Sequence, residues 1–212
     1  MGGSMSDKPG LNAAYGLNGP DDNRRLYADW AGTYDSDFAQ GMDYRLPALV
    51  AEGFVRAGGS GPVLDIGAGT GLCGQALAAL GVGPVDGTDL SPEMLARAAE
   101  KRVYQRLFEG NVLTRLDVPD GHYRGVVSSG TFTLGHLGPE ALAEVVRVLG
   151  SDGVACLSIN AAHYHAAGFK DAFANFGPQI AQLDLTEVPI YGAGAKGDHA
   201  ADKGYLVTFR RA

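Results

Sequence analysis

Between Gly61 and Asn160, the hydrophobic residues of the chain alternate between two kinds of pattern. Short apolar runs predict β-strands at 62–66, 83–89, 104–110, 123–130 and 153–159. Segments in which apolar residues recur every three or four positions predict helices at 72–81, 91–102 and 138–150. Because strands that alternate with helices form βαβ units, we expect a mostly parallel, doubly wound sheet of the Rossmann-like α/β class.

The segment 20–58 has a helical pattern. Tyr27, Trp30 and Tyr34 recur at helical spacing, so one face of this segment carries an aromatic stripe. Gly32 lowers the helix propensity by about 1 kcal/mol, and we expect a break near it. The pattern therefore predicts an N-terminal helical cover that precedes the sheet.

The pattern changes again in the segment 161–212. A helix is predicted at 169–176, and two β-like runs follow at 180–192 and 204–212. The loop 193–203 that joins these runs is rich in glycine and charge. Two late strands so close in sequence predict an antiparallel hairpin, which would extend the sheet at its C-terminal side.

The length and composition of the chain fit one domain. The 212 residues suffice for one α/β domain with a hydrophobic core, and 45% of them are hydrophobic. We expect this domain at 20–212, with the cofactor-binding core at 61–160 and a substrate-side segment with the hairpin at 161–212. Residues 1–19 are predicted to be a flexible N-terminus, in which residues 1–4 resemble a remnant of cloning.

The charge of the chain limits the classes of molecule that it is expected to bind. A formal net charge of −7 repels phosphate backbones, so we expect a small-molecule substrate rather than nucleic acid. No apolar run approaches the roughly 20 residues that span a membrane, and the N-terminus lacks the regions of a signal peptide. The two cysteines, Cys73 and Cys156, lie in stretches predicted to be buried, which favours a reducing cytoplasm. The oligomeric state is left open.

The stretch "VLDIGAGTGLCG" carries two overlapping glycine fingerprints. Gly67, Gly69 and Gly71 spell G-x-G-x-G, which is typical of proteins that bind S-adenosylmethionine. Gly69, Gly71 and Gly74 spell G-x-G-x-x-G, which is typical of dinucleotide-binding proteins. Asp65 precedes both fingerprints, and a carboxylate near the mouth of this turn would oppose a pyrophosphate. It would suit the ammonium group of S-adenosylmethionine, so the charge argument favours that cofactor.

The end of the second predicted strand offers groups for an adenosine. Asp89 follows Gly69 by 20 residues and can accept hydrogen bonds from ribose hydroxyls in either cofactor class. Leu90 and Met94 offer apolar surface for an adenine ring, at the opening turn of a helix that Ser91 is expected to cap.

Three motifs in succession resemble those of a known family. "VLDIGAGTGLCG", "GTDLSPEMLARA" and "VVSSGTF" are similar to successive motifs of class I S-adenosylmethionine-dependent methyltransferases. A closer resemblance covers most of the chain: "YADWAGTYDSDF", "VLDIGAGTG" and "GTFTLGHLGPEAL" resemble the methyltransferase-like proteins related to the one deleted in Williams–Beuren syndrome. The resemblance implies that the chain is an enzyme that transfers a methyl group from S-adenosylmethionine.

The resemblance also implies a set of cofactor-binding residues. These are Tyr27, Trp30 and Tyr34 from the cover, Asp65, Gly67, Ala68, Gly69, Thr70 and Gly71 from the first loop, and Asp89, Leu90, Met94, Asn111, Val112, Ser129 and Gly130 from the following strand ends. Asn111 stands where the family commonly has an acid, and its side-chain carbonyl would accept a hydrogen bond from the adenine amino group. Close relatives usually read T-H-G-H after the fourth strand, whereas "TLGH" keeps only His136.

Methyl transfer from a sulfonium is an in-line displacement that needs no covalent nucleophile on the protein. A general base is required only if the acceptor must lose its proton early. His136 is the first candidate for that base and Tyr34 is the second. The segment "NAAHYHAAGF" is expected to border the acceptor with His163, Tyr164, His165 and Phe169.

Other interpretations stay open. The same fold could carry a cofactor-binding regulatory module without methyl transfer, or an NAD-dependent oxidoreductase. His163 and His165 alternate as in a strand and could bind a metal, but no third ligand lies nearby in the sequence, so we predict no metal site. Cys73 is expected to be a small core residue.

Overall fold

The computed structural model describes residues 20–212 apart from Asp198. The predicted flexible segment 1–19, with the predicted remnant at 1–4, lies outside the described residues. The elements are α2 (Pro20–Trp30), a π-helical turn (Tyr34–Gln40), α3 (Leu46–Arg56), β1 (Val63–Ile66), α4 (Leu72–Ala79), β2 (Val85–Asp89), α5 (Pro92–Glu100), β3 (Arg106–Glu109), β4 (Tyr123–Phe132), a 3₁₀ turn (Pro139–Ala141), α6 (Leu142–Val148), β5 (Leu149–Asn160), α7 (Ala161–Ala166), α8 (Phe169–Phe176), a 3₁₀ turn (Gly177–Gln179), β6 (Ile180–Pro189) and β7 (Lys203–Arg211).

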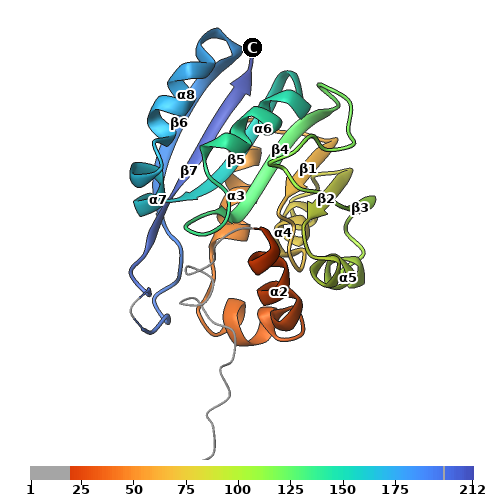
Figure 1. The fold of residues 1–212 in the computed structure, drawn as a ribbon, viewed down its shortest axis with the longest axis vertical. Helices are drawn as coiled ribbons and strands as arrows, with labels where there is room; N and C mark the ends of the chain where they lie inside the picture. Colours follow the sequence, from red (N-terminus) through yellow and green to blue (C-terminus); the bar gives the residue numbers. More distant parts are fainter. Residues whose placement is uncertain (1–19, 198) are drawn as a thin grey trace, which may run out of the picture.

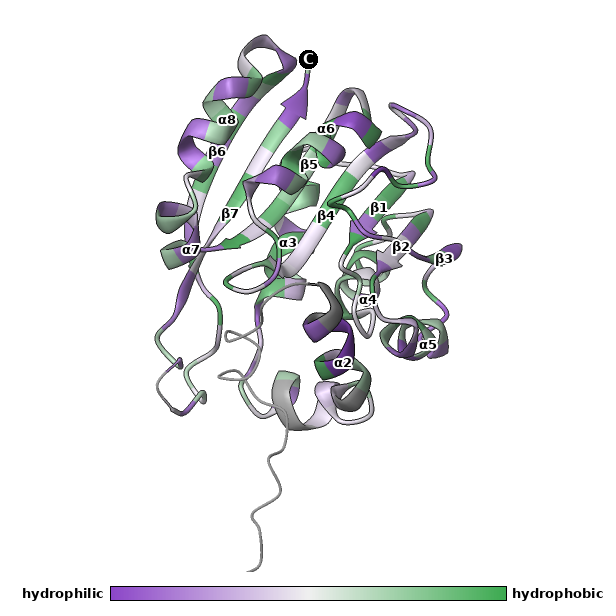
Figure 2. Cartoon of the chain, in the orientation of Figure 1, coloured by the Kyte–Doolittle hydropathy of each residue, from purple (hydrophilic) through white to green (hydrophobic). Residues whose placement is uncertain are grey.

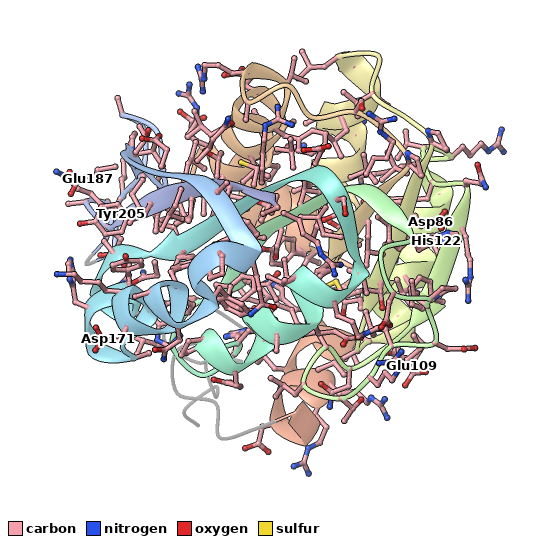
Figure 3. The ribbon with its side chains drawn as sticks, turned by 90° about the horizontal axis from the view of Figure 1, so that it is seen from above. Asp86, Glu109, His122, Asp171, Glu187 and Tyr205 are labelled. Carbon is pink, nitrogen blue, oxygen red and sulfur yellow. The ribbon has the colours of Figure 1, made fainter. Side chains whose placement is uncertain are left out.

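The strands form one seven-stranded sheet in the order β3-β2-β1-β4-β5-β7-β6. The pairs from β3 to β5 are parallel, whereas β7 runs antiparallel to both β5 and β6. Figure 3, which views the molecule from above, shows Asp86 and Glu109 on one side and Glu187 and Tyr205 of the hairpin on the other. The predicted fold class, a mostly parallel doubly wound sheet with a C-terminal antiparallel hairpin, is confirmed.

Helices cover both faces of the sheet (Figure 1). On one face, α6 and α8 contribute residues such as Leu142 and Phe173 to a core that also contains Phe132. On the other face, α3 and α4 pack through residues such as Phe54 and Leu77. Figure 2 shows hydrophobic stretches along the central strands, and hydrophilic stretches on α8 and at the end of β7 next to the C-terminus. Each large apolar side chain buried in these layers contributes roughly 1.5–3 kcal/mol.

The cover seen in the structure is shorter than the predicted range 20–58. The expected break near Gly32 is confirmed, because α2 ends at Trp30 and a π-helical turn follows. The helix α3, however, packs on the sheet and does not belong to the cover, since Val50 and Phe54 are fully buried in the core. The cover therefore consists of α2, the π-helical turn and the segment that leads to α3.

The register of the parallel strands brings the predicted motifs to one edge. Ile66 at the end of β1 pairs with Thr88, and Asp89 at the end of β2 pairs with Glu109. The backbone amide of Gly67 donates to the carbonyl of Thr88 over 2.9 Å, which joins the glycine loop to β2. Figure 1 shows α2 beyond this edge, beneath the lower ends of the central strands. The edge lies where ligands bind in open α/β sheets.

The two cysteines are buried and not joined by a disulfide. Cys73 packs in the core through α4, as expected, and also borders the cavity described below. Within the described part of the chain, every helix is too short or too polar to cross a bilayer.

Candidate cofactor and acceptor site

The carboxyl ends of β1, β2, β3 and β4 border one cavity of about 580 Å³. This volume lies within the range of roughly 300–1,000 Å³ that is common for small-molecule sites. Tyr27 and Tyr34 line the cavity on the side of the cover. The sequence-predicted residues that line it are Tyr27, Tyr34, Gly67, Ala68, Gly69, Thr70, Asp89, Leu90, Met94, Asn111, Val112, Ser129, Gly130 and His136.

Three of the predicted cofactor-binding residues do not line this cavity. Trp30 is only 3% exposed and borders a smaller space beside it. Gly71 begins α4 with φ +90°, and a Cβ there would lie 3.0 Å from the ring of Tyr104. Asp65 is fully buried behind the cavity wall. The expectation that its carboxylate lies at the mouth of the turn is therefore wrong, because β1 is buried on both faces up to its last residue.

Asp65 is held in an environment that resists its charge. Burial raises the pKa of its carboxyl to about 7, a hydrogen bond from Tyr104 opposes that rise, and the nearby carboxylate of Asp89 adds to it. The Tyr104 hydroxyl donates to Oδ2 of Asp65 over 2.7 Å. The second oxygen, Oδ1, has no hydrogen-bond partner among the described residues. A positive charge in the adjoining cavity would stabilise the ionised form of Asp65.

Two positions of the first loop require glycine for different structural reasons. At Gly67, with φ +68°, a Cβ would lie 2.2 Å from Oγ1 of Thr131, so this glycine permits the loop to pack on β4. At Gly69, with φ +53°, a Cβ would meet no atom within 4 Å. Gly69 also lines the cavity, and it therefore leaves space where a ligand can approach the backbone.

Asp89 connects the first loop to the second. Its Oδ2 accepts a hydrogen bond from the amide of Gly69 over 2.8 Å, and its Oδ1 accepts one from the amide of Ser91 over 3.0 Å. Burial raises the pKa of Asp89, while these amides lower it. Each carboxylate oxygen keeps a lone pair, so the side chain on the cavity wall can still accept from ligand hydroxyls.

The expected cap of the next helix is confirmed. The Ser91 hydroxyl accepts a hydrogen bond from the amide of Met94 over 3.2 Å, which begins α5. Leu90 and Met94 line the cavity beside Asp89, so this turn presents apolar side chains next to a hydrogen-bond acceptor. That combination matches the needs of an adenosine.

Asn111 lies on the cavity wall but also stabilises its own turn. Its Oδ1 accepts a hydrogen bond from the amide of Leu113 over 2.9 Å. The same oxygen is the one expected to accept a hydrogen bond from an adenine amino group. The carbonyl has a second lone pair, so the turn and a ligand can share it.

His136 faces the cavity as a neutral ring. Its Nδ1 lies 3.0 Å from the carbonyl of Leu134, and because a carbonyl only accepts, Nδ1 carries the proton. The other nitrogen, Nε2, then accepts from the hydroxyl of Tyr27 over 2.8 Å. Burial lowers the pKa of His136, a hydrogen bond to the carbonyl of Leu134 opposes this decrease, and the nearby His163 lowers the pKa further. His136 is therefore a weak base whose lone pair points at the cover.

Tyr34 is poorly suited to the role of general base. Burial, together with the nearby Tyr44 and Tyr27, raises the pKa of its phenol well above the usual value. The phenol therefore stays protonated at neutral pH. It can donate a hydrogen bond or present its ring to a ligand, but it does not accept a proton.

The structure shows contacts of the cover that the sequence analysis missed. Asp35 accepts hydrogen bonds from the hydroxyl of Thr70 in the glycine loop and, over 2.6 Å, from the ammonium of Lys101. Arg24 of α2 pairs with Glu109 and donates to the carbonyl of Leu90. These partners are far apart in the sequence, so no local pattern could have indicated them.

The expected acceptor segment is only partly on the cavity. His163 lines it, and its Nε2 lies 2.9 Å from the carbonyl of Leu137. Tyr164 and Phe169 are in the hydrophobic core, so the expectation was wrong for them. His163 and His165 lie on the helix α7 rather than on a strand. Among the described residues, no three His, Cys, Asp or Glu side chains are grouped as a metal site requires.

Known proteins share sequence and fold with this chain. A family model described as "Methyltransferase domain" matches residues 63–153. A curated relative, "Methyltransferase-like protein 27" from Homo sapiens, is 31% identical over 163 residues, which cover 74% of this chain and 66% of the relative. The chain thus spans just under two thirds of the length of that relative.

Solved structures share the fold at low sequence identity. A TehB-like S-adenosylmethionine-dependent methyltransferase from Corynebacterium glutamicum is 23% identical, with a TM-score of 0.62 over 89% of this chain and 99% of the other. The [4+2]-cyclase SpnF is 16% identical, with a TM-score of 0.67 over 92% of this chain and 97% of the other. These likenesses show the fold. The family model shows that residues 63–153 are similar to a methyltransferase domain, and the human relative extends that similarity to 74% of the chain.

Proposed function

We propose that the protein transfers the methyl group of S-adenosylmethionine to a small-molecule acceptor that binds in the same cavity. The observation that carries the proposal is the joined arrangement of Gly69 and Asp89 on one cavity wall. The glycine leaves room for a ligand against the backbone, and the carboxylate offers acceptor oxygens for a ribose. We also infer that the chain groups with the Williams–Beuren-region methyltransferase-like proteins, which its 31% identity with Methyltransferase-like protein 27 supports.

The residues present fit S-adenosylmethionine. Asp89 would hold the ribose hydroxyls, and Leu90 and Met94 would border the adenine. The buried hydroxyl of Ser129 lines the cavity and has no hydrogen-bond partner among the described residues, so a ligand can satisfy it. The carboxylate of Asp65, behind the wall, would favour a ligand that carries positive charge there.

The order of the strands argues against a dinucleotide. The common NAD-binding arrangement is an all-parallel sheet in the order 3-2-1-4-5-6. Here the antiparallel β7 lies between β5 and β6. The oxidoreductase interpretation therefore has less support than methyl transfer.

When bound, S-adenosylmethionine supplies an electrophilic methyl group on a positively charged sulfur. The protein's contribution is to align the acceptor with that methyl group, and alignment can lower a barrier by roughly 7–11 kcal/mol in favourable cases. Tyr27 and Tyr34 line the cavity on the side of the cover, and closure of the cover over a bound ligand would exclude water from it. The weakly basic His136 suits an acceptor that needs no early deprotonation.

A small acceptor fits the space better than a macromolecule. The cavity lies under the cover. Among the described residues that line it, Arg24 is the one lysine or arginine, and Arg24 is already paired with Glu109. A polyanion would meet this wall together with the carboxylates of Asp89 and Glu140. The electrostatics of the site therefore favour a small neutral or basic molecule.

A cofactor-binding protein without methyl transfer is the second candidate. It is favoured by the likeness to a structure described as a [4+2]-cyclase, because one fold can carry different chemistries. The test is to incubate the protein with methyl-labelled S-adenosylmethionine and pooled metabolites of its host. Transfer of label to a small molecule supports the proposal. Cofactor binding without transfer in every pool contradicts it and favours the second candidate.

A further inference from the structure

A second, smaller cavity of about 50 Å³ adjoins the main one behind the cover. Tyr27, Tyr34, Tyr44, Gly130 and His136 border both spaces. We call the smaller space the aromatic chamber. A water molecule needs a cavity of roughly 10–15 Å³, so the aromatic chamber has room for a group of a few heavy atoms.

Aromatic rings form most of the chamber. The rings of Trp30 and Tyr34 meet edge to face at 5.1 Å between centroids, and Tyr27 stacks on Trp30 at 5.9 Å. On another side, Tyr44 and Tyr191 lie 6.0 Å apart, and their backbones form an antiparallel bridge. Because these rings come from the cover and from the loop after β6, the chamber is complete only when the cover is seated.

The described lining of the chamber carries no ionic side chain. Among the described residues that line it, there is no Asp, Glu, Lys or Arg. Its histidine, His136, is neutral because burial lowers its pKa. A carboxylate or phosphate would find no positive partner here, whereas the faces of aromatic rings attract positive charge.

One polar group in the chamber lacks a partner. Oγ1 of Thr133 is buried and makes no hydrogen bond with any described residue. A buried hydroxyl without a partner is unfavourable, so a ligand that can donate or accept a hydrogen bond would be stabilised beside it. An aromatic wall with one unsatisfied hydroxyl selects a small polar group that tolerates positive charge.

We propose that the aromatic chamber is the subsite for the reacting head of the methyl acceptor, and that this head is an amine. The proposal rests on the proposed methyl transfer. Tyr27, Tyr34 and Tyr44 border both spaces, so an amine in the chamber lies beside the cavity that would hold the cofactor. The apolar Leu137 and Pro139 in the main cavity would contact the body of the acceptor.

The reaction places a positive charge on the acceptor nitrogen, and the aromatic rings of the chamber can stabilise that charge. An amine binds as the ammonium, which the ring faces attract. Before transfer the ammonium releases its proton to bulk water, because desolvation lowers its pKa, and this frees the nitrogen lone pair. The nitrogen lone pair forms the N–C bond to the methyl carbon as the C–S bond breaks, and the bonding pair stays on sulfur. The positive charge moves from sulfur to nitrogen, where the rings of Trp30 and Tyr44 can stabilise it. An alcohol would need a base to remove its proton, and the chamber offers only the weakly basic His136.

Trp30 provides a direct reporter, since it is the one tryptophan of the chain. The protein is first saturated with the demethylated cofactor, whose sulfur carries no charge, and loading is verified by calorimetry. Benzylamine, benzyl alcohol and benzoate are then titrated while Trp30 fluorescence is recorded. We expect benzylamine to change the emission with a midpoint at least tenfold lower than benzyl alcohol, and benzoate to give no saturable change.

Two matched pairs of variants locate the effect. Thr133→Val should raise the benzylamine midpoint about 3- to 10-fold, as expected for one lost hydrogen bond, while Thr186→Val on the exposed β6 should not. Tyr44→Leu should raise it about 5- to 30-fold, whereas Tyr44→Phe keeps the ring face and should stay within about twofold.

The outcomes distinguish a failure of the proposed methyl transfer from a failure of the proposed amine subsite. If calorimetry shows no binding of the cofactor, the proposed methyl transfer fails, whatever Trp30 reports. If the cofactor binds but benzyl alcohol or benzoate matches benzylamine, the amine assignment is overturned and methyl transfer stands. The same holds if no probe changes Trp30 emission in the loaded protein, or if Thr133→Val and Thr186→Val behave alike.

Discussion

The backbone amide of Gly69 donates a hydrogen bond of 2.8 Å to Oδ2 of Asp89. Two motifs that are 20 residues apart in the sequence are therefore one structural unit on the cavity wall. The second oxygen of Asp89 accepts from Ser91, at the start of α5. Asp89 consequently supports both the local fold and the proposed ribose site.

Replacing Asp89 tests both of these roles. Asp89→Ala should weaken S-adenosylmethionine binding by about 2–4 kcal/mol, or roughly 30- to 1000-fold, because charge-assisted hydrogen bonds are lost. It should also lower the melting temperature without ligand, since the amides of Gly69 and Ser91 lose their acceptor. Asp89→Asn keeps one acceptor oxygen and should lose less of both. Calorimetry and thermal unfolding measure the two effects, and unchanged affinity in Asp89→Ala would exclude the ribose role.

Gly69 and Gly67 form a matched pair. Gly69→Ala has room for its methyl group and should lower stability by only about 1 kcal/mol, from the positive φ. The methyl group would occupy cavity space, so affinity for the cofactor should fall at least tenfold. Gly67→Ala collides with Thr131 and should mainly destabilise the fold. If Gly69→Ala binds the cofactor as tightly as the natural chain, the loop is not the ligand cradle.

The periodic parts of the sequence predicted the fold well. The buried strands and the stripe with Leu142 and Val145 are local patterns, and a parallel sheet follows from their alternation. The cap at Ser91 is also local. The boundary of the cover was predicted less well, because the apolar face of α3 does not reveal whether it packs on the sheet or over the cavity.

The candidate site was only partly predictable for the same reason. Residues of the glycine loop have a recognisable spacing, but the ion pair of Asp35 with Lys101 joins distant segments. Likewise, Asp65 could be recognised as an important acid, but not as a buried one. Burial depends on the strands on either side of β1, which no local pattern records.

Asp65 should make stability depend on pH. Its carboxyl has a pKa of about 7 in the folded protein without ligand, against an ordinary value of 3.8. The folded state therefore binds the proton more tightly, and this contribution is complete below about pH 4 and lost as pH rises through about 7. In Asp65→Asn this loss of stability at high pH should be absent, so the variant should melt at a higher temperature than the natural chain at pH 8. The exposed Asp184→Asn serves as control, and equal pH profiles for both variants would contradict the assignment.

Asp35 should hold the cover on the core. Asp35→Ala removes its contacts with Thr70 and Lys101, so amides of residues 27–40 should exchange hydrogen faster while those of β4 and β5 do not. Since partly exposed ion pairs contribute about 0.2–1 kcal/mol, cofactor affinity should fall by at most about fivefold. Mass-spectrometric hydrogen exchange measures the first effect. Uniform exchange across the chain would show that the cover is held by other contacts.

The central claim is that the cavity beneath the cover is built for S-adenosylmethionine. Calorimetric titration of the natural chain with S-adenosylmethionine, its demethylated product and NAD tests it most directly. We predict that the first two bind with one site per chain and that NAD binds at least 100-fold more weakly. Binding of NAD with equal or higher affinity, or no binding of S-adenosylmethionine, would contradict the account.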